Sequence, residues 1–361
     1  MTVVVVVAAG VVVGAAIALV VLLVVARAVR TGRQRRRAQE RAGLRPLLIE
    51  VLAGDRDTAA VRRLNREEAS LFQTLAIEFL TKVRGEGRDR LAAFFVETGA
   101  VAEAERRCLR SGVSARAAAV DFLGTVGSDT SADTIRPLLN DRSFLVRTAA
   151  VRTLGRMGTP ADVPRLLAGL DGERSVPFAT VADALTQIGP AAILRLRDGL
   201  RAPNVLARAA CAEVLGLLGA VDAVEDLLAH LHPVEDDEVR MRCARALGRI
   251  GTPRALLPLT RLVSPSEPPG VRAVAVQSLG RLGGRRATAA LAPRLDDDDH
   301  RVARNAAAAL IVLGDAGLEA LRDRAARPGR GAAYARQALA RASTQSGSAP
   351  TTELQRRAAE P

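Results

Sequence analysis

Few residues of this chain could do metal or acid–base chemistry. It has three histidines, His230, His232 and His300. The first two stand shortly before the acidic run Glu235–Glu238, and the third directly follows Asp296–Asp299. Both runs come just before a predicted helix, where carboxylates cap free amide groups and favour the helix dipole. They also lack the alternating ligands and the turn glycine of a calcium loop. We therefore predict that they cap helices, and that the chain holds no metal and no cofactor.

Arginine recurs at one position of a repeating pattern, in steps of 31, 61, 32 and 32 residues. The residues are Arg116, Arg147, Arg208, Arg240 and Arg272. Such a row could bind an anion, or each arginine could tie its helix to a carboxylate of the adjacent unit. Asp162 and Asp222 are candidate acceptors for these ties. Phe178 and Ala303 stand at the equivalent position of two other units, which interrupts any continuous basic row. We favour the structural ladder.

Recognisable catalytic motifs do not occur in the sequence. It contains no glycine-rich phosphate loop, no nucleophile elbow, no HExxH metal motif and no His-Glu dipeptide. Trp is absent and Tyr334 is the single tyrosine, so the aromatic platforms of a base-binding enzyme are not expected either. We predict a protein that is not an enzyme. An enzyme subunit, of the lyase type or another, with an unrecognised cleft is the alternative.

A regular spacing of glycines shows which elements must carry these residues. In steps of 30 to 32 residues the chain has Gly127, Gly158, Gly189, Gly219, Gly251, Gly283 and Gly314. An apolar residue precedes each glycine, and a leucine stands four residues before every one. A small or slim residue stands eight before, and Cys211 and Cys243 occupy two of these slots. These offsets lie on one stripe of an α-helix, and the glycine supplies its left-handed end.

A second helix is predicted to begin after each glycine, most clearly at Thr159-Pro160 and Thr252-Pro253. Each unit is thus a predicted helical hairpin with an apolar stripe on both helices. One hairpin cannot bury both stripes, whereas stacked hairpins complete a continuous core. The expected fold class is all-α, an α-solenoid. Abundant Ala, Leu and Val, with only 2% aromatic residues, suits such closely packed helices.

The units resemble the short HEAT-like repeats first named in phycobilisome lyases. The resemblance is carried best by Val239-Arg240 through Ala246-Leu247-Gly248 to Ile250-Gly251, and it extends over about Ser114–Ala325. It implies an armadillo-type fold in a bacterial protein. It implies little about function, because the family includes scaffolds, lyase subunits and other enzymes.

The N-terminal segment is predicted to cross a membrane. Residues 3–26 carry no charge and include twelve valines. As a helix they would span about 36 Å, enough for a bilayer core. A cleaved signal peptide is the rival interpretation, because Ala26-Arg27-Ala28 resembles a cleavage site, but no positive segment precedes the apolar run. Gly10 and Gly14 form a GxxxG pattern, a possible transmembrane dimer face.

Arginines follow this span closely, namely Arg27, Arg30, Arg33, Arg35, Arg36 and Arg37. The positive-inside rule then places the N-terminus outside and the rest of the chain in the cytoplasm. These arginines would also lie against anionic lipid headgroups. The expected location is the inner membrane, as a single-pass protein.

The net charge of +13 and the pI of about 11.2 would suit a nucleic-acid partner, but the charge is unevenly placed. Residues 1–45 have eight Arg and one Glu, and residues 324–361 have seven Arg and two Glu. The long middle, 46–323, is left with a net charge of +1. We therefore expect no nucleic-acid partner.

The predicted organisation has five parts: a transmembrane helix at 3–26, a basic juxtamembrane segment at 27–45, a diverged helical cap at 46–112, a HEAT-like array of seven repeats with a terminal helix at 113–342, and a disordered tail at 343–361. The expected function is a membrane-tethered scaffold on the cytoplasmic face that binds a protein partner. An integral membrane enzyme or an envelope-synthesis enzyme is the expected kind of partner.

Overall fold

The computed structural model describes residues 42–53, 64–110, 112–127 and 131–347. These residues form helices and their connections, with no strand among them, so the all-α prediction is confirmed there. Contacts divide the chain into two compact units, Met1–Thr134 and Ile135–Pro361, which we describe separately. The predicted membrane span 3–26, its Gly10 and Gly14, and the arginines from Arg27 to Arg37 lie outside the described residues. No helix of the described part has the length and apolar character needed to cross a bilayer.

The first unit is a set of helices built around phenylalanines. Its helices are a segment at 42–53, α2 (Arg66–Leu80), α3 (Glu86–Glu97), α4 (Ala100–Arg110) and α5 (Val113–Val126), followed by the short α6 (Ala132–Ile135). Phe72, Phe94, Phe95 and Phe122 meet edge to face, with ring centroids 5.3 to 5.4 Å apart. Edge-to-face contacts of this kind add to the area that the rings bury. The unit therefore has an aromatic core of its own.

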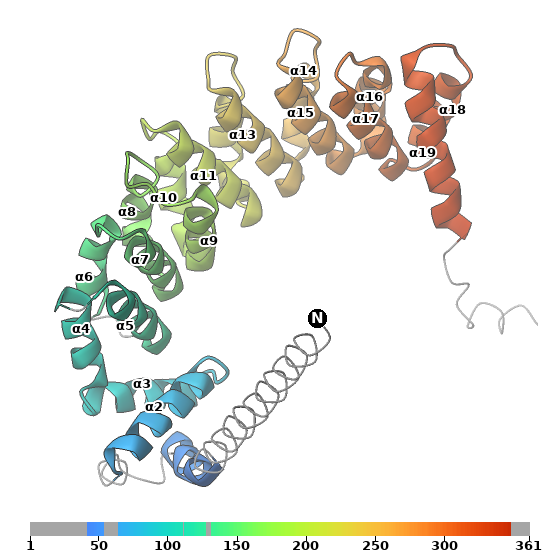
Figure 1. Cartoon of the computed structure of the whole chain (residues 1–361). Coiled ribbons are helices and arrows are strands. Elements are labelled where there is room, and N and C mark those ends of the chain that lie inside the picture. The colour runs from blue at the N-terminus through green and yellow to red at the C-terminus, as the bar shows by residue number, and fades with distance from the viewer. Residues whose placement is uncertain (1–41, 54–63, 111, 128–130, 348–361) are drawn as a thin grey trace, which may run out of the picture. The chain divides into compact units, whose positions relative to one another are not determined.

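The second unit repeats one hairpin (Figure 1). In most hairpins a first helix is followed by a short 3-10 turn and then by a short second helix. In the hairpin of α15 and α16 the 3-10 turn comes after the second helix, and between α17 and α18 there is no 3-10 turn. The elements are η3 (Arg136–Asn140), α7 (Phe144–Met157), η4 (Pro160–Asp162), α8 (Val163–Ala168), α9 (Phe178–Ile188), η5 (Gly189–Ala192), α10 (Ile193–Gly199), α11 (Val205–Leu217), η6 (Val221–Ala223), α12 (Val224–Ala229), α13 (Asp237–Ile250), η7 (Pro253–Ala255), α14 (Leu256–Arg261), α15 (Pro269–Leu282), α16 (Gly284–Leu291), η8 (Ala292–Asp296), α17 (His300–Val312), α18 (Asp315–Ala325) and α19 (Arg330–Gly347).

Each first helix ends within two residues before the glycine of the sequence repeat, which we call its closing glycine. Gly158 and Gly251 cap α7 and α13 with φ values of 74° and 78°, in the left-handed region. An L-residue there would strain the backbone by roughly 1–2 kcal/mol. The glycine spacing in the sequence therefore marks where the chain turns from a first helix into the next element.

The first helices pack against one another in sequence, α7 on α9 and then α11, α13, α15 and α17 in turn. The repeated leucines fill the interior of this stack and are fully buried; they are Leu154, Leu185, Leu215, Leu247, Leu279 and Leu310. Burying one such side chain contributes about 1.5–3 kcal/mol. The two repeat cysteines, Cys211 and Cys243, are buried free thiols in the same interior. The stacking of hairpins thus completes the core.

The first helices approach most closely at glycines three residues before the closing glycine. A Cβ added to Gly216 would lie 2.5 Å from the Cα of Ala246, and one on Gly248 would lie 2.6 Å from the Cβ of Ser278. At Gly280 the nearest atom would be the Cβ of Ala309, at 2.6 Å. Contacts this short leave no room for a methyl group. The backbones of α11, α13, α15 and α17 are therefore as close as glycine allows.

Two predicted boundaries differ from the structure, and the division into compact units does not coincide with the predicted start of the array. A helix already includes residues 42–45, before the predicted start of the cap at 46. The compact units divide at 134/135, because α5 packs on α4 and α2, whereas the array was predicted to start at 113. Helix α19 continues to Gly347, past the predicted start of the tail at 343. Its inner side buries Ala332, Ala335 and Ala338, which gives the helix a packed stem from which the last turn extends. Residues 348–361 lie outside the described residues.

We expect Gly216→Ala to destabilise the array by about 1–3 kcal/mol, because the added methyl group overpacks the contact with Ala246. Chemical denaturation of the full chain, followed by circular dichroism, measures the change. Gly270→Ala is the matched control: its Cβ would meet only the flexible thioether of Met241, at 3.2 Å. Equal loss of stability in both variants would contradict close helix packing at Gly216.

Candidate functional site

The predicted arginine ladder lies at the start of the first helices, against the loops that precede them. Arg147 Nη1 donates to the carbonyl of Asp141 at 2.9 Å, and Arg208 Nη1 donates to that of Ala202 at 2.8 Å. The guanidinium of Arg240 is almost fully buried. Each of these arginines thus satisfies main-chain carbonyls that its own loop would otherwise leave unpaired. Arg116 holds the equivalent position in α5, in the first unit.

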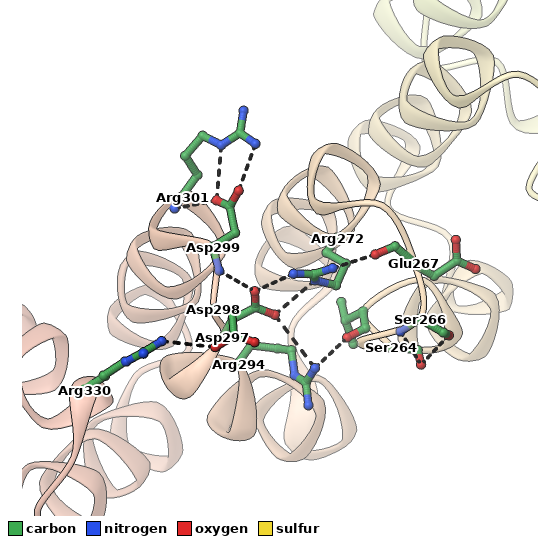
Figure 2. A network of polar contacts seen from close by, with 11 residues as sticks. Ser264, Ser266, Glu267, Arg272, Arg294, Asp297, Asp298, Asp299, Arg301 and Arg330 are labelled. Atoms are coloured by element: carbon green, nitrogen blue, oxygen red, sulfur yellow. Dashed lines mark hydrogen bonds and ion pairs between the residues drawn. The ribbon is translucent and has the colours of Figure 1, made fainter.

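Three of these arginines also form an ion pair with a carboxylate of the next repeat. Arg208 meets Glu235 at 2.9 Å, Arg240 meets Glu267 at 2.5 Å, and Arg272 meets Asp297 at 2.6 Å. Arg272 binds both oxygens of Asp297, and its Nη1 also donates to the carbonyl of Glu267 (Figure 2). These guanidiniums are therefore committed to contacts within the protein and do not form an open row for a ligand.

The acceptors predicted for the ladder, Asp162 and Asp222, were wrong. Asp162 is buried and binds Arg136 at 2.8 Å and Arg165 at 3.1 Å, two arginines outside the ladder. Asp222 is exposed in η6. The true acceptors come from the loop after the second helix, where the number of residues varies from repeat to repeat.

His230 and the acidic residues near the histidines make hydrogen bonds in the loops and at the N-termini of helices. His230 Nδ1 lies 2.6 Å from Glu235, which also accepts from Arg208. Asp236 and Asp299 accept main-chain hydrogen bonds at the starts of α13 and α17. Among the residues that the structure describes, no group of three or more His, Cys, Asp or Glu side chains could hold a metal ion.

One glutamate and three arginines gather on the solvent-facing side of α11 and α13. Glu213, on α11, faces three arginines of α13: Arg249 at 2.5 Å, Arg242 at 3.1 Å and Arg245 at 3.5 Å. The side chain of the glutamate is only 12% exposed, whereas the three arginine side chains are 25–30% exposed. We call these four residues the Glu213 cluster. Glu238 pairs with Arg242 as well, and three guanidiniums beside two carboxylates still leave a surplus of one positive charge.

The ionisation of Glu213 is determined by its neighbours. Burial by itself would raise the pKa of this carboxyl group, but hydrogen bonds from Arg249 and Arg242, together with their charges, outweigh burial and lower the pKa. Glu213 is therefore ionised at neutral pH. A carboxylate held in this state accepts hydrogen bonds and does not deliver a proton.

Further contacts hold Arg242 in place. Its guanidinium lies over the ring of Phe178, 4.8 Å from the centroid, and its Nη2 meets Glu238 at 2.6 Å. A cation over an aromatic face and a charge-assisted hydrogen bond each favour the charged guanidinium. Because Arg242 is fixed from three sides, the cluster presents a pre-organised arrangement of charge to solvent.

Exposed apolar side chains lie at the same end of the first helices. Leu217 on α11 is 50% exposed and Val312 on α17 is 75% exposed. Arg281, on α15 between them, is also exposed and makes no ion pair with any residue in the described part of the chain. Leu217, Arg245, Arg249, Arg281 and Val312 are named the first-helix surface. Fixed arginines next to exposed apolar groups give this surface the composition of a protein-binding site.

Two of the cavities in the described part of the chain have carboxylates in their linings. One, of about 490 Å³ in the first unit, is lined by α2, α4 and α5, and its Glu103 is paired with Arg106 and Arg107. The other, of about 420 Å³ in the second unit, has Asp171, which accepts hydrogen bonds from Asn204 and the main chain. The ionisable groups named here are engaged with neighbours, unlike the surplus guanidiniums of the Glu213 cluster.

The repeats match a family model described as HEAT repeats, over residues 111–186, 193–279, 224–312 and 258–343. The chain belongs to the HEAT-repeat family. The predicted HEAT-like array is thereby confirmed, and its hairpins stack as a HEAT solenoid does. No curated protein sequence matches the chain.

Solved structures with similar folds are distant from this HEAT protein. Human deoxyhypusine hydroxylase in complex with glycerol is 18% identical, over 68% of this chain and 99% of that chain, with a TM-score of 0.31. The CpcE–CpcF complex of phycocyanin lyase from a Nostoc species is 21% identical, over 60% and 91%, with a TM-score of 0.28. Kap95p, described with RanGDP, is 13% identical, over 82% and 46%, with a TM-score of 0.45. The family assignment rests on the repeat matches alone.

The contact between Glu213 and Arg245 could have been predicted from the sequence, although their position in the repeat was not considered. Glu213 stands six residues before its closing glycine, and Arg245 stands at the same offset in the next repeat. Equivalent positions of adjacent repeats lie side by side, so an acid and a base at one offset predict a contact. Only the repeat positions of the buried apolar stripe and of the arginine ladder were compared in the sequence.

We expect Arg272→Met to destabilise the protein by about 3 kcal/mol, because buried Asp297 would keep only Arg294, at 3.8 Å, as a charged partner. Thermal and chemical denaturation of the full chain measure this loss. Arg301→Met is the matched control: Arg301 also binds both oxygens of an aspartate, Asp299, but its side chain is 52% exposed, so little change is expected. Equal effects of the two substitutions would show that Arg272 does not support the ladder.

The Glu213 cluster should give the protein a defined pH dependence. Because the pKa of Glu213 is lowered in the folded state, its stabilising contribution is present above about pH 4.5 and is lost as the pH falls through the folded-state pKa. We expect Glu213→Gln to be less stable than the unaltered protein at pH 7, and the difference to shrink below pH 4.5. Denaturation midpoints from pH 7 to pH 3 test this, and a difference independent of pH would contradict it.

Proposed function

We propose that this HEAT protein is a scaffold without catalysis of its own, and that a protein partner binds its first-helix surface. The observation that carries the proposal is the Glu213 cluster, in which three partly exposed arginines are held in place around one carboxylate. Pre-organised charge beside exposed apolar groups favours binding, because few side chains must be ordered when the partner arrives. Leu217 and Val312 supply those apolar groups.

The ionisation of the cluster supports binding over chemistry. General acid–base catalysis uses a group whose pKa lies near the working pH. The neighbouring arginines lower the pKa of Glu213 and move it away from that range. An enzyme or lyase subunit would need a reactive group elsewhere, and the cavity carboxylates described above are engaged with their neighbours.

The proposed scaffold is tethered to the cytoplasmic face of the inner membrane. Support comes from the sequence: the charge-free run 3–26 is long enough to span a bilayer, and Arg27 to Arg37 follow it on one side. These arginines would contact anionic lipid headgroups, and Gly10 and Gly14 would allow two spans to pack closely. Confined to the membrane plane, the repeats would meet an integral membrane enzyme or an envelope-synthesis enzyme.

Site-specific photo-cross-linking in membranes tests the binding surface. A photoreactive amino acid replaces Leu217 in the full chain, and the matched control replaces Leu194, which is similarly exposed on the second helix α10. We expect a discrete cross-linked product with one protein from position 217 and none from position 194. Equal products from both positions, or none from position 217, would overturn the proposed surface.

The tether is tested separately by fractionation. We expect the full chain to stay with membranes during an alkaline wash, and a chain lacking 3–26 to be released, because the apolar run supplies the insertion energy. Release of the full chain by the same wash would refute the tether. It would leave the proposed partner surface to be judged by cross-linking.

A further inference from the structure

Four equivalent positions on adjacent first helices form a line of exposed side chains. They stand two residues before the closing glycines, and we call them the closing row: Leu217 on α11, Arg249 on α13, Arg281 on α15 and Val312 on α17. On α7 and α9 the same row has Arg156 and Gln187. Between α11 and α17 it therefore consists of two adjacent arginines with an exposed apolar side chain at each end.

The spacing of this row is set by the helix contacts. Packed helices lie 8–10 Å apart, and the distance is shortest where small residues meet. Gly216, Gly248 and Gly280, at which first helices are in close contact, each stand one residue before a member of the row. Successive members are thus about 8 Å apart at the backbone. An extended peptide advances about 3.3 Å per residue, so each step corresponds to two or three residues of a peptide lying across the helices.

The two central arginines have unsatisfied capacity for anions. Arg249 shares Glu213 with Arg242 and Arg245, and Glu238 pairs with Arg242 alone, so two negative charges serve three positive ones. Arg281 is exposed and has no ion-pair partner among the described residues. A guanidinium binds a carboxylate through two parallel hydrogen bonds, and this geometry favours Arg at such sites. Both positions therefore fit carboxylates of a ligand.

The two apolar residues at the ends of the closing row favour a peptide over a nucleic acid as its ligand. Leu217 and Val312 present apolar surface, which a peptide side chain can cover and a phosphate backbone cannot. Binding to single-stranded nucleic acid also uses aromatic platforms for the bases, and none of the four row residues is aromatic. The repeat body between 46 and 323 has a net charge of only +1, so the positive charge is local. This pattern fits a short acidic segment with apolar ends.

We infer that the closing row binds an extended acidic segment of the partner, with two carboxylates about three residues apart flanked by an apolar residue on each side. The inference rests on the proposed function and specifies its partner. The first carboxylate binds Arg249, helped by Arg245, and the second binds Arg281. The apolar residues cover Leu217 and Val312. The row then acts as a four-point site across four helices.

Fluorescence anisotropy with the full chain in detergent tests the inference. The probes are a labelled peptide LSSDSSDSSL, its neutral counterpart LSSNSSNSSL and a ten-nucleotide single-stranded RNA. We expect saturable binding of the acidic peptide only. Arg281→Gln should weaken it about 10-fold, since a charge-assisted hydrogen bond contributes an amount that corresponds to at least a tenfold change. Arg254→Gln, which removes an exposed arginine of the 3-10 turn η7, outside the closing row, is the control and should bind like the unaltered protein.

The outcomes separate this inference from the proposed function. Equal binding of the neutral peptide, equal binding of RNA, or an Arg281→Gln variant with unchanged affinity would overturn the acidic-segment site. If the partner still cross-links through position 217 in that case, the scaffold function stands and only the chemistry of its ligand is wrong. Because Arg281 lies outside the Glu213 cluster, its substitution leaves the fold intact, and a denaturation curve verifies this.

Discussion

The close approach of consecutive first helices governs most of what this HEAT protein presents to its surroundings. Neither helix of a hairpin can bury its apolar stripe alone, so each hairpin depends on the next. At Gly216, Gly248 and Gly280 the glycine backbone lies against the small residues Ala246, Ser278 and Ala309 of the next first helix, with no room for an added methyl group. This contact sets the distance between equivalent residues, buries the repeated leucines and aligns the outward positions into rows. Core and surface are thus determined by the same packing.

Arginine has two separate roles in this fold, and burial distinguishes them. The ladder arginines, such as Arg240 and Arg272, are buried and satisfied by loop carbonyls and by carboxylates of the next repeat. They fix one hairpin to its neighbour. The three arginines of α13 that face Glu213 keep part of their surface in solvent and outnumber their two acidic partners, Glu213 and Glu238. An abundance of arginine in the sequence therefore says less about function than the face on which each residue lies.

The sequence predicted the repeat, the closing glycines and the buried leucines well, because these depend on local geometry that every unit shares. It did not predict the acceptors of the ladder. Glu235 and Glu267 lie 27 residues after their arginines, whereas Asp297 lies 25 after Arg272, because the intervening loops differ in length. The contact of Glu213 with Arg245 was within reach of sequence reasoning, since both share one offset. The extent of α19 was not, because its last turns extend from a stem that is packed in three dimensions. The predictions for the membrane span and for the partner remain predictions.

The glycine contacts also bear on how such an array can change over evolutionary time. Each hairpin adds one fixed increment to the stack, so gaining or losing a unit shifts every downstream position by a whole step. An exposed leucine or arginine of one repeat would then lie beside the equivalent residue of a different repeat, although neither of the two residues had been substituted. New combinations of charged and apolar side chains along the solvent-facing surface can therefore arise by gain or loss of repeats, while the apolar core between the hairpins stays the same.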